Sequence, residues 1–338
     1  MKTTELHQLL QSNDRFVLTT HENPDGDGLG SMLALGYYLQ SIGKNTTLIV
    51  TPNLGTIANW EGPKSTLEIF NPKVHTEVFN QAQCWILIDA SDPKRLGPIY
   101  PIFQSSRATK VCIDHHLKDA PQGFDHEYTD PGASASAQLI YRFLKPIYSG
   151  SWELIAPALY LGIVADTGNF RFSNATPEIH EIASFLIAQG AQPPETYQAL
   201  YHQDSFAKLQ LWSRLLQRLQ LFEDNRLALI EVGPKDFSAT QSRYEDLDEL
   251  VQQPMRIPSV EVSALLTDLG EGWTKISLRS RKRVDVHHIC QRFEGGGHRL
   301  AAGAKIKSPL NQVRADLISA VSAQLNYHNE SRTPPYVN

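Results

Sequence analysis

Short apolar runs alternate with a helical pattern in the first third of the chain. The runs cover residues 16–20, 47–50, 84–89 and 111–114, and apolar residues at helical spacing follow the first run up to about Ser41. Alternation of strands and helices is typical of βαβ units, whose parallel strands are joined by right-handed crossovers. The pattern therefore predicts a mainly parallel α/β sheet. Residues 52–79 show no clear period, and we expect only loops with a short helix or strand there.

The remainder of the chain predicts helices followed by a second, smaller α/β unit. Helical periodicity extends over residues 177–222 with a break at 190–194, and the first strand of the new unit is expected at 226–232. The further expected elements are a helix near 244–252, a hairpin of strands 260–267 and 273–279 turning at 269–272, a helix at 286–293, a Gly-rich loop, a strand at 302–306 and an amphipathic helix at 312–327.

The length of the chain favours two domains, because 338 residues exceed what one hydrophobic core usually organises. We expect an N-terminal domain over residues 1–190, a helical connector over 191–224, a smaller α/β domain over 225–328 and a loose tail over 329–338. The N-terminus has no apolar signal region, and no later run is long and uncharged enough to span a bilayer. These observations predict a cytoplasmic protein with no membrane partner.

The cysteine content argues against disulfides, and the net charge argues against some classes of binding partner. The three cysteines, Cys84, Cys112 and Cys290, do not imply a disulfide framework. A net charge of -5 argues against a protein that coats long duplex nucleic acid. Residues 275–307 nevertheless hold nine Lys or Arg against two acids, a surplus of seven. This surplus indicates either a solvated basic face or a local anion site.

Acidic and imidazole side chains gather at four points, each at the end of an apolar run. The points are His21 with Asp25 and Asp27, then Asp89, then Asp114-His115-His116, and finally Asp166 after the run 159–164. If these runs are strands of one parallel sheet, their carboxyl ends deliver all four groups to a single site. The first group alone would fit an ordinary turn. Together, carboxylates and imidazoles without cysteines suit a hard divalent ion such as Mn²⁺.

In this order the motifs resemble those of the DHH phosphoesterases. The first is HxxPDxDxxGS over residues 21–31, followed by Asp89, the Asp-His-His triplet and Asp166-Thr167-Gly168. Near the C-terminus, Arg279-Ser280 and GGGHRLAAG over 295–303 resemble the DHHA1 domain that accompanies this family. The resemblance covers nearly the whole chain. It implies a mainly parallel DHH domain, a helical connector and a smaller α/β DHHA1 domain.

The resemblance also implies a two-metal centre. One ion would be held by His21, Asp25 and Asp89, and the second by Asp27, Asp89, His115 and Asp166, so that Asp89 bridges the pair. Two Mn²⁺ ions, or alternatively Mg²⁺ or Co²⁺, could share a water, lower its pKa and stabilise charge on phosphorus. Among the catalytic candidates, Asp114 would orient an imidazole and His116 would contact the phosphoryl group.

Substrate binding would belong to the C-terminal domain. Gly295, Gly296 and Gly297 permit backbone N–H groups to approach an anion, with Arg279, Ser280 and His298 beside them. Arg171 is a further candidate, which either pairs with phosphate or caps the segment that follows it. The small residues 133–136 are interpreted as a helix cap, with phosphate contact as the alternative. Glu294 stands where the pattern often has glycine, which leaves the substrate open.

The arrangement resembles the branch of the family that acts as nano-RNase and 3′-phosphoadenosine 5′-phosphate (pAp) phosphatase. This implies a hydrolase that cleaves very short single-stranded RNA to mononucleotides and pAp to AMP. The closest alternative is a phosphodiesterase for cyclic or linear dinucleotides such as c-di-AMP or pApA, which shares every motif. A nucleotide-binding regulator without catalysis is disfavoured by the complete ligand set. The oligomeric state, a homodimer included, is left open.

Overall fold

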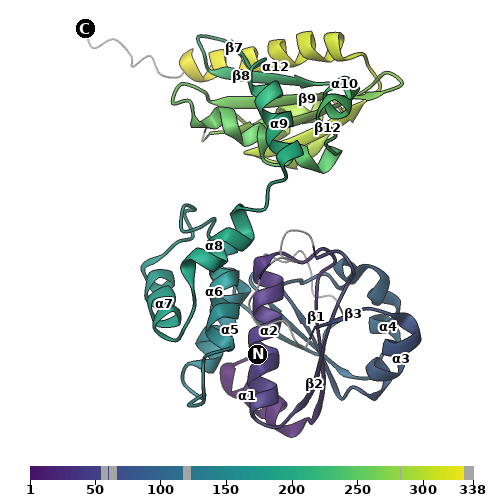
Figure 1. The fold of residues 1–338 in the computed structure, drawn as a ribbon, viewed down its shortest axis with the longest axis vertical. Coiled ribbons are helices and arrows are strands. Elements are labelled where there is room, and N and C mark those ends of the chain that lie inside the picture. The colour runs from purple at the N-terminus through teal and green to yellow at the C-terminus, as the bar shows by residue number, and fades with distance from the viewer. Residues whose placement is uncertain (55–59, 61–66, 117–122, 282, 331–338) are drawn as a thin grey trace. The chain divides into compact units, whose positions relative to one another are not determined.

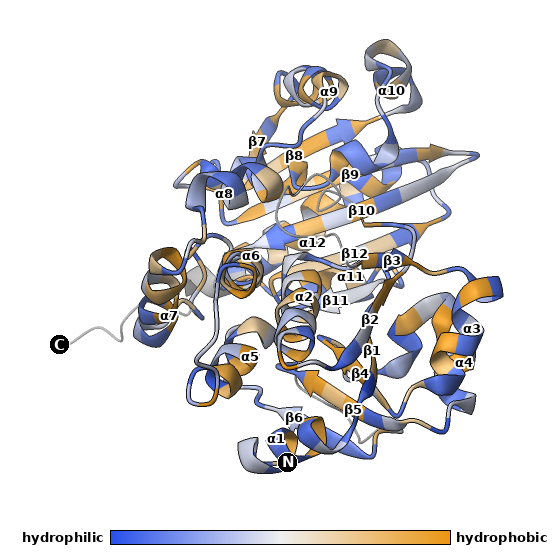
Figure 2. Cartoon of the chain, turned by 60° about the horizontal axis from the view of Figure 1, so that its bottom comes forward, coloured by the Kyte–Doolittle hydropathy of each residue, from blue (hydrophilic) through white to orange (hydrophobic). Residues whose placement is uncertain are grey.

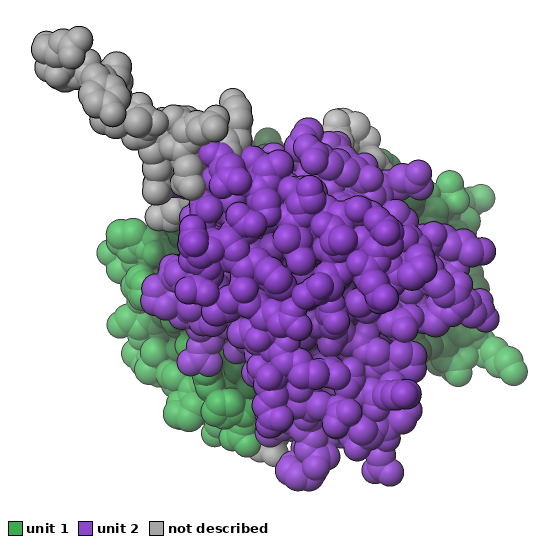
Figure 3. Space-filling view, turned by 90° about the horizontal axis from the view of Figure 1, so that it is seen from above, with its two compact units in different colours: residues 1–203 green, residues 204–338 purple. Residues whose placement is uncertain are grey.

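Two compact units divide the chain in this computed structural model, Met1–Gln203 and Asp204–Asn338, drawn in green and purple in Figure 3. The structure describes residues 1–54, 60, 67–116, 123–281 and 283–330. The segment expected as a connector contributes α8 (Pro193–Tyr201) to the first unit and α9 (Phe206–Leu216) to the second. Of the expected tail, residues 331–338 lie outside the described residues.

The first unit is built on a six-stranded sheet in the order β3-β2-β1-β4-β5-β6. Its strands are β1 (Arg15–Thr20), β2 (Asn45–Val50), β3 (Leu67–Ile69), β4 (Cys84–Ile88), β5 (Thr109–Asp114) and β6 (His126–Thr129). All neighbouring strands are parallel, which confirms the predicted sheet, although β6 was not foreseen. The chain moves outward from β1 to β3 and then returns to β4 beside β1. The carboxyl ends of β1 and β4 therefore lie at the point where the strand order reverses.

Helices cover both faces of this sheet (Figure 1). One face is covered by α1 (Thr3–Ser12), α2 (Gly26–Ser41) and α5 (Ser136–Leu144), and the other by α3 (Pro72–Gln81), η2 (Pro93–Ile99) and α4 (Tyr100–Ser105). Because helices cover both faces, the middle of the central strands is apolar without alternation, as the hydrophobic part of β5 in Figure 2 shows. Leu18 and Ile86 point into one core, whereas Val17 and Trp85 point into the other.

The apolar run 159–164 is not a strand. It belongs to helix α6 (Ile155–Asp166), which packs against α2, α5 and α7 (Pro177–Ala188). Because α6 is buried on nearly all sides, its sequence is continuously apolar, and such a short run cannot be told from a buried strand by periodicity. The expectation of a strand was therefore wrong, and Asp166 is the last residue of a helix.

Glycines let α2 and α6 approach closely. A Cβ atom on Gly30 would lie 2.2 Å from the Ala158 carbonyl oxygen, and one on Gly26 would lie 2.6 Å from the Ala165 Cβ. On the other helix, a Cβ on Gly162 would lie 2.6 Å from Oδ1 of Asp27. This contact brings the C-terminal end of α6, with Asp166, beside the first turn of α2.

The second unit contains a six-stranded sheet in the order β11-β12-β10-β9-β8-β7. Its strands are β7 (Gln220–Phe222), β8 (Leu227–Val232), β9 (Val262–Gly270), β10 (Trp273–Ser280), β11 (Gly296–His298) and β12 (Ala301–Ile306). The predicted hairpin of β9 and β10 is confirmed, and only β8 and β9 pair in parallel. The Gly-rich segment, expected as a loop, instead includes the edge strand β11. The strand β7 was not predicted.

Two sets of helices cover the second sheet. The helices α11 (Val286–Gln291) and α12 (Leu310–Glu330) pack on one face, and α9 and α10 (Pro234–Thr240) on the other. The helix expected near 244–252 is replaced by two 3₁₀ segments, η3 (Tyr244–Leu247) and η4 (Leu250–Arg256). Among the described residues, no helix is both long and apolar enough to cross a membrane.

Substitution of Gly30 tests the close contact of α2 and α6. Gly30→Ala places a methyl group against the backbone of α6, and overpacking of this kind typically lowers the free energy of unfolding by about 1–3 kcal/mol. Urea denaturation of the metal-free protein measures the change. Gly132→Ala is the control, because its added Cβ would come near only the Asp130 side chain. A loss below about 0.5 kcal/mol for Gly30→Ala would mean that the helices separate easily.

Candidate metal centre

The acidic and imidazole side chains predicted from the sequence meet at the carboxyl end of the first sheet. His21 follows β1, Asp89 follows β4, and the Asp-His-His triplet begins at the last residue of β5. Three groups of residues each offer one ligand atom per residue, and within a group these atoms lie within 4.8 Å of one another. The groups are His21, Asp25 and Asp89; Asp27, His115 and Asp166; and Asp89, His115 and His116. The structure thus brings together all six residues expected to bind metal.

The start of α2 positions Asp25 in the group formed with His21 and Asp89. Asp25 is the N-cap residue, and its carboxylate accepts hydrogen bonds from the amides of Asp27 at 2.9 Å and Gly28 at 3.0 Å. Burial raises the pKa of Asp25, but the nearby His21 imidazole and the hydrogen bond from the Gly28 amide outweigh it and lower that pKa to about 2. A Cβ on Gly28 would lie 2.4 Å from the Thr20 hydroxyl and 3.3 Å from Nε2 of His21. Glycine is therefore required where the helix borders the group.

His21 is held with one ring nitrogen turned toward the carboxylates. Its Nδ1 lies 2.9 Å from the carbonyl oxygen of Glu22, so an Nδ1–H group donates there and Nε2 is left for other partners. Nε2 lies 3.6 Å from Oδ2 of Asp89 and 3.9 Å from Oδ1 of Asp25. Backbone orientation of one nitrogen is the usual support for a metal-binding imidazole.

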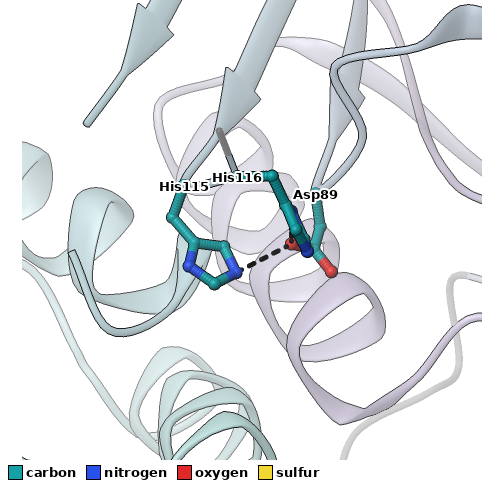
Figure 4. Close-up of side chains that lie close together, drawn as sticks. All are labelled: Asp89, His115 and His116. Atoms are coloured by element: carbon teal, nitrogen blue, oxygen red, sulfur yellow. Dashed lines mark ion pairs between the residues drawn. The ribbon is translucent and has the colours of Figure 1, made fainter. Parts of the chain in front are cut away.

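Asp89 faces two groups at once. Its side chain is buried, with Oδ2 toward His21 and Oδ1 at 3.5 Å from Nε2 of His115, the contact dashed in Figure 4. Its φ of 63° is left-handed, an uncommon conformation that aspartate tolerates better than most residues. Such a position between two groups of ligands is what a bridging carboxylate requires.

The N-terminus of α5 holds both Asp27 and Asp89. The fully buried Asp27 accepts the amide of Ser136 at 2.5 Å and that of Ala137 at 2.9 Å, while the Ser136 hydroxyl donates to Oδ1 of Asp89 at 3.0 Å. The N-cap of α5 is Ala135, which has no capping side chain, so the interpretation of residues 133–136 as a hydroxyl cap was wrong. Sequence reasoning missed Ser136, because a serine before a helix normally indicates a cap.

His115 and Asp166 lie beside Asp27 and complete the second group of candidate ligands. Nε2 of His115 lies 2.9 Å from Oδ2 of Asp166 and 3.8 Å from Oδ2 of Asp27, and its Nδ1 lies 3.3 Å from the Ala133 carbonyl oxygen. Burial lowers the pKa of His115, but the interactions with Asp166 and Asp89 outweigh it and raise that pKa to about 9. Asp166 reaches this place from the end of α6.

Asp114 is paired with His116 instead of joining the metal groups. Its Oδ1 lies 2.7 Å from Nδ1 of His116 and also accepts the amide of that residue at 3.2 Å. Burial raises the pKa of Asp114, but these hydrogen bonds outweigh it and lower the pKa below its usual value. The His116 side chain is 46% exposed, so its ring is oriented by Asp114 while remaining accessible to a ligand. This geometry supports the predicted role of Asp114.

Arg171 is turned back onto its own segment. Its Nε donates to the Gly168 carbonyl oxygen at 2.9 Å, and its guanidinium lies 5.9 Å from the centre of the Phe172 ring. Because Gly168 precedes Arg171, this contact caps the end of α6 and not the segment that follows, which was the alternative stated from the sequence. The assignment of Arg171 to substrate binding stays a prediction.

The candidates for substrate binding in the second unit divide into two sets. Arg279, Gly296, Gly297 and His298 line one pocket of about 440 Å³, together with Tyr244, Lys275 and Ser277. The Ser280 hydroxyl instead donates to the Val284 carbonyl oxygen at 2.7 Å. Gly295 packs against β12, where an added Cβ would lie 2.3 Å from the Gly303 carbonyl oxygen. These two residues therefore have structural contacts of their own.

Comparisons with known proteins identify the domains of the chain. Residues 15–163 match the DHH family, N-terminal domain, and residues 238–326 match the DHHA1 domain. The "Bifunctional oligoribonuclease and PAP phosphatase NrnA" of Thermus thermophilus is 30% identical over 313 residues, which are 91% of this chain and 89% of that protein. The chain belongs to the DHH phosphoesterase family. The Bacillus subtilis protein of the same name is 26% identical over 93% of this chain and 97% of its own length.

A solved structure supports the fold of this DHH phosphoesterase. The crystal structure of an exopolyphosphatase-related protein from Bacteroides fragilis superposes with a TM-score of 0.83 and covers 95% of both chains at 24% identity. At this identity the likeness concerns the fold alone.

The residues of this DHH phosphoesterase fit divalent metal ions, on which the family depends. Nε2 of His21 and Nε2 of His115 are buried without a hydrogen-bond partner, and both face carboxylates. Burial and the neighbouring carboxylates of Asp89 and Asp166 raise the pKa of Asp27 well above its usual value. Cations between these oxygen and nitrogen atoms would satisfy the unpaired nitrogens and remove the repulsion between the acids.

Ser136→Ala should weaken metal binding without changing the fold, because it removes the hydroxyl that orients Asp89 but keeps the amide that binds Asp27. Loss of such a supporting hydrogen bond typically costs about 10- to 100-fold in metal affinity. Calorimetric titration of the metal-free protein with Mn²⁺ measures it. Ser41→Ala serves as the matched control, since that hydroxyl bonds the Tyr38 carbonyl oxygen at the opposite end of α2. Equal affinities for the two variants would show that Ser136 does not position Asp89.

Metal binding should release protons and strengthen as pH rises. Burial lowers the pKa of His21, but the nearby carboxylates of Asp25 and Asp89 outweigh it, so that His21, like His115, has a pKa of about 9 in the metal-free protein. Each imidazole must lose a proton to coordinate, so roughly two protons should leave at pH 7 and fewer above pH 9. Calorimetry in buffers of different ionisation enthalpy counts them. Release of less than about one proton at pH 7 would contradict the raised pKa values.

Proposed function

We propose that this DHH phosphoesterase hydrolyses very short single-stranded oligoribonucleotides to mononucleotides and 3′-phosphoadenosine 5′-phosphate to AMP. The observation that carries the hydrolytic part is Asp89, whose two oxygens face two groups of histidine and carboxylate ligands. The substrate class is supported by relatives named as bifunctional oligoribonuclease and PAP phosphatase, which align with this chain over 89% and 97% of their lengths. The family and these relatives identify the chain as a hydrolase of phosphoester bonds.

In the first unit we assign His21, Asp25 and Asp89 to one ion and Asp27, Asp89, His115 and Asp166 to the other. Two divalent ions, Mn²⁺ by preference for these oxygen and nitrogen ligands, would lower the pKa of water and stabilise negative charge on phosphorus. The protein's own part is to hold the carboxylates in place through the amides of α2 and α5. His116, oriented by Asp114 and partly exposed, is positioned to donate a hydrogen bond to a phosphoryl oxygen.

In the second unit, the pocket lined by Arg279 and His298 would hold the part of the nucleotide remote from the cleaved bond. Its volume of about 440 Å³ lies within the usual range for small-molecule sites. The Arg279 guanidinium supplies a permanent positive charge, and His298 adds an exposed ring nitrogen. We further propose a cytoplasmic location, in keeping with substrates of this kind.

The alternative substrate is a cyclic dinucleotide. The "Cyclic-di-AMP phosphodiesterase PdeA" of Listeria monocytogenes is 24% identical over 94% of this chain, but the aligned part is only 49% of that protein. The relatives named as oligoribonuclease and PAP phosphatase align over far more of their own length. This difference favours short linear RNA and pAp.

The proposal predicts that Mn²⁺-loaded protein hydrolyses a diribonucleotide and pAp faster than cyclic di-AMP or pyrophosphate. Steady-state assays with the four substrates measure this order. Faster hydrolysis of cyclic di-AMP would replace the proposed function with the alternative one.

Asp89→Asn should lower kcat/KM at least about 100-fold on every substrate, because the residue assigned to bridge the two ions is changed. The thermal unfolding midpoint should stay the same or rise, because repulsion between acids is relieved.

Asparagine suits this variant because it tolerates the left-handed backbone at position 89. The matched control is Glu153→Ala, which removes an exposed carboxylate near the opposite end of α6 from Asp166. That control should keep nearly full activity. If Asp89→Asn retained more than about one-tenth of wild-type activity, a difference of roughly 1.4 kcal/mol in barrier, the bridging assignment would be wrong.

A further inference from the structure

Basic and aromatic side chains continue beyond the pocket of the second unit along one face of its sheet. On β10, Trp273, Lys275, Ser277 and Arg279 are partly exposed, and the residues between them are buried. Side chains of alternate residues point to the same face of a strand, so these four form a row. The row begins at Arg279 in the pocket and runs to Trp273 at the end of β10 next to the β9–β10 turn.

The neighbouring strand β12, which lies next to β10 in Figure 2, adds two lysines to this face. Lys305 pairs with Lys275 across the two strands, and Lys307 lies two residues further along. The Lys305 and Lys307 ammonium groups lie 5.1 Å and 5.9 Å from the centre of the Trp273 ring. Lys275 lies in the same way 5.0 Å from the Tyr244 ring. Lys275 still lines the pocket, whereas Trp273, Lys305 and Lys307 lie beyond it, and we call these three residues the basic face.

The cations of the basic face are available to an anion. Within the part of the chain that the structure describes, neither Lys305 nor Lys307 has an acidic partner within 4.0 Å. Lys305 and Lys307 are exposed, and both contact an aromatic ring instead of a carboxylate. Lysines above aromatic rings, repeated along a strand, combine the two groups that bind single-stranded nucleic acid, a charge for phosphate and a ring for stacking a base.

The spacing of the row also suits an extended polynucleotide. Alternate residues of a strand are about 6.6–6.8 Å apart, so the distance from Arg279 to Trp273 is roughly 20 Å. This repeat is comparable with the separation of successive phosphates in an extended single strand. The carboxylates of Asp248 and Glu249 line the other side of the pocket, between η3 and η4, and would keep the anionic backbone on the β10–β12 side.

We propose that the basic face binds the nucleotides of a single-stranded oligoribonucleotide that extend beyond the nucleotide held at Arg279 and His298. The inference rests on the proposed function and deepens it, because it makes substrate length depend on residues outside the pocket. Dinucleotides and pAp do not reach the basic face. Substrates of four or five nucleotides gain affinity from it.

The test compares kcat/KM for a diribonucleotide and a pentaribonucleotide in two variants, Lys305→Ala/Lys307→Ala and Trp273→Leu. Each should keep the dinucleotide value within about twofold and lose about 5- to 20-fold on the pentanucleotide, mainly through KM. The double variant should also lessen the decline of affinity with salt, because fewer counterions are released. The control Lys73→Ala/Lys235→Ala removes two exposed lysines from α3 and α10 with the same change of net charge.

Equal losses on both substrates, or a similar loss in the control, would overturn the inference in favour of a general effect on charge or fold. Unchanged values on the pentanucleotide would show that the basic face is only solvated. Binding of a fluorescently labelled pentanucleotide in chelator, which needs no hydrolysis, should weaken at least about fivefold in the double variant. This binding measurement separates failure of the basic face from failure of the proposed function, which the wild-type substrate panel decides.

Discussion

The mutual repulsion of four carboxylates is the constraint on which the first unit depends. Asp25, Asp27, Asp89 and Asp166 converge at one end of the sheet, and Asp27 and Asp89 are almost fully buried. Buried acids of like charge are tolerated only when donors or cations compensate them. The amides at the start of α2 and α5 supply part of this compensation, and His21 and His115 supply more. The negative charge that remains uncompensated gives the cluster an affinity for divalent cations.

The fold meets this constraint by assembling elements that are remote in the sequence. The strand order reverses between β1 and β4, and His21 and Asp89 lie at the carboxyl ends of these two strands. The close contact of α2 with α6 brings Asp27 and Asp166 to the same end of the sheet. Gly162 shows how the two requirements meet, because a side chain there would collide with both α5 and the carboxylate of Asp27. The packing of α6 against α2 and the position of Asp27 therefore depend on each other, since a methyl group at position 162 would displace this candidate metal ligand.

The sequence predicted the sheet and the residues at its strand ends because both follow from local patterns. His21 and Asp89 each come directly after a strand and Asp114 is the last residue of one, and a parallel sheet gathers such positions without further information. Asp166 was selected through the family motif, and the structure brings it beside Asp27 and His115. It was placed on the wrong element, since a helix buried on all sides has no polar face to reveal its period. Ser136 was missed because its hydroxyl bonds a residue 47 positions away, a pairing that only the tertiary fold creates.

Glu294 shows how the structure resolves an ambiguity that the sequence left open. The family pattern often has glycine at this position, and the departure left the substrate open. The residue has a φ of 57°, the left-handed region, which explains a preference for glycine by backbone conformation alone. Glu294 does not line the pocket of Arg279 and His298, and its exposed side chain can remain in solvent. The departure from the pattern therefore costs some backbone strain and leaves the lining of the pocket, with Arg279 and His298, unchanged.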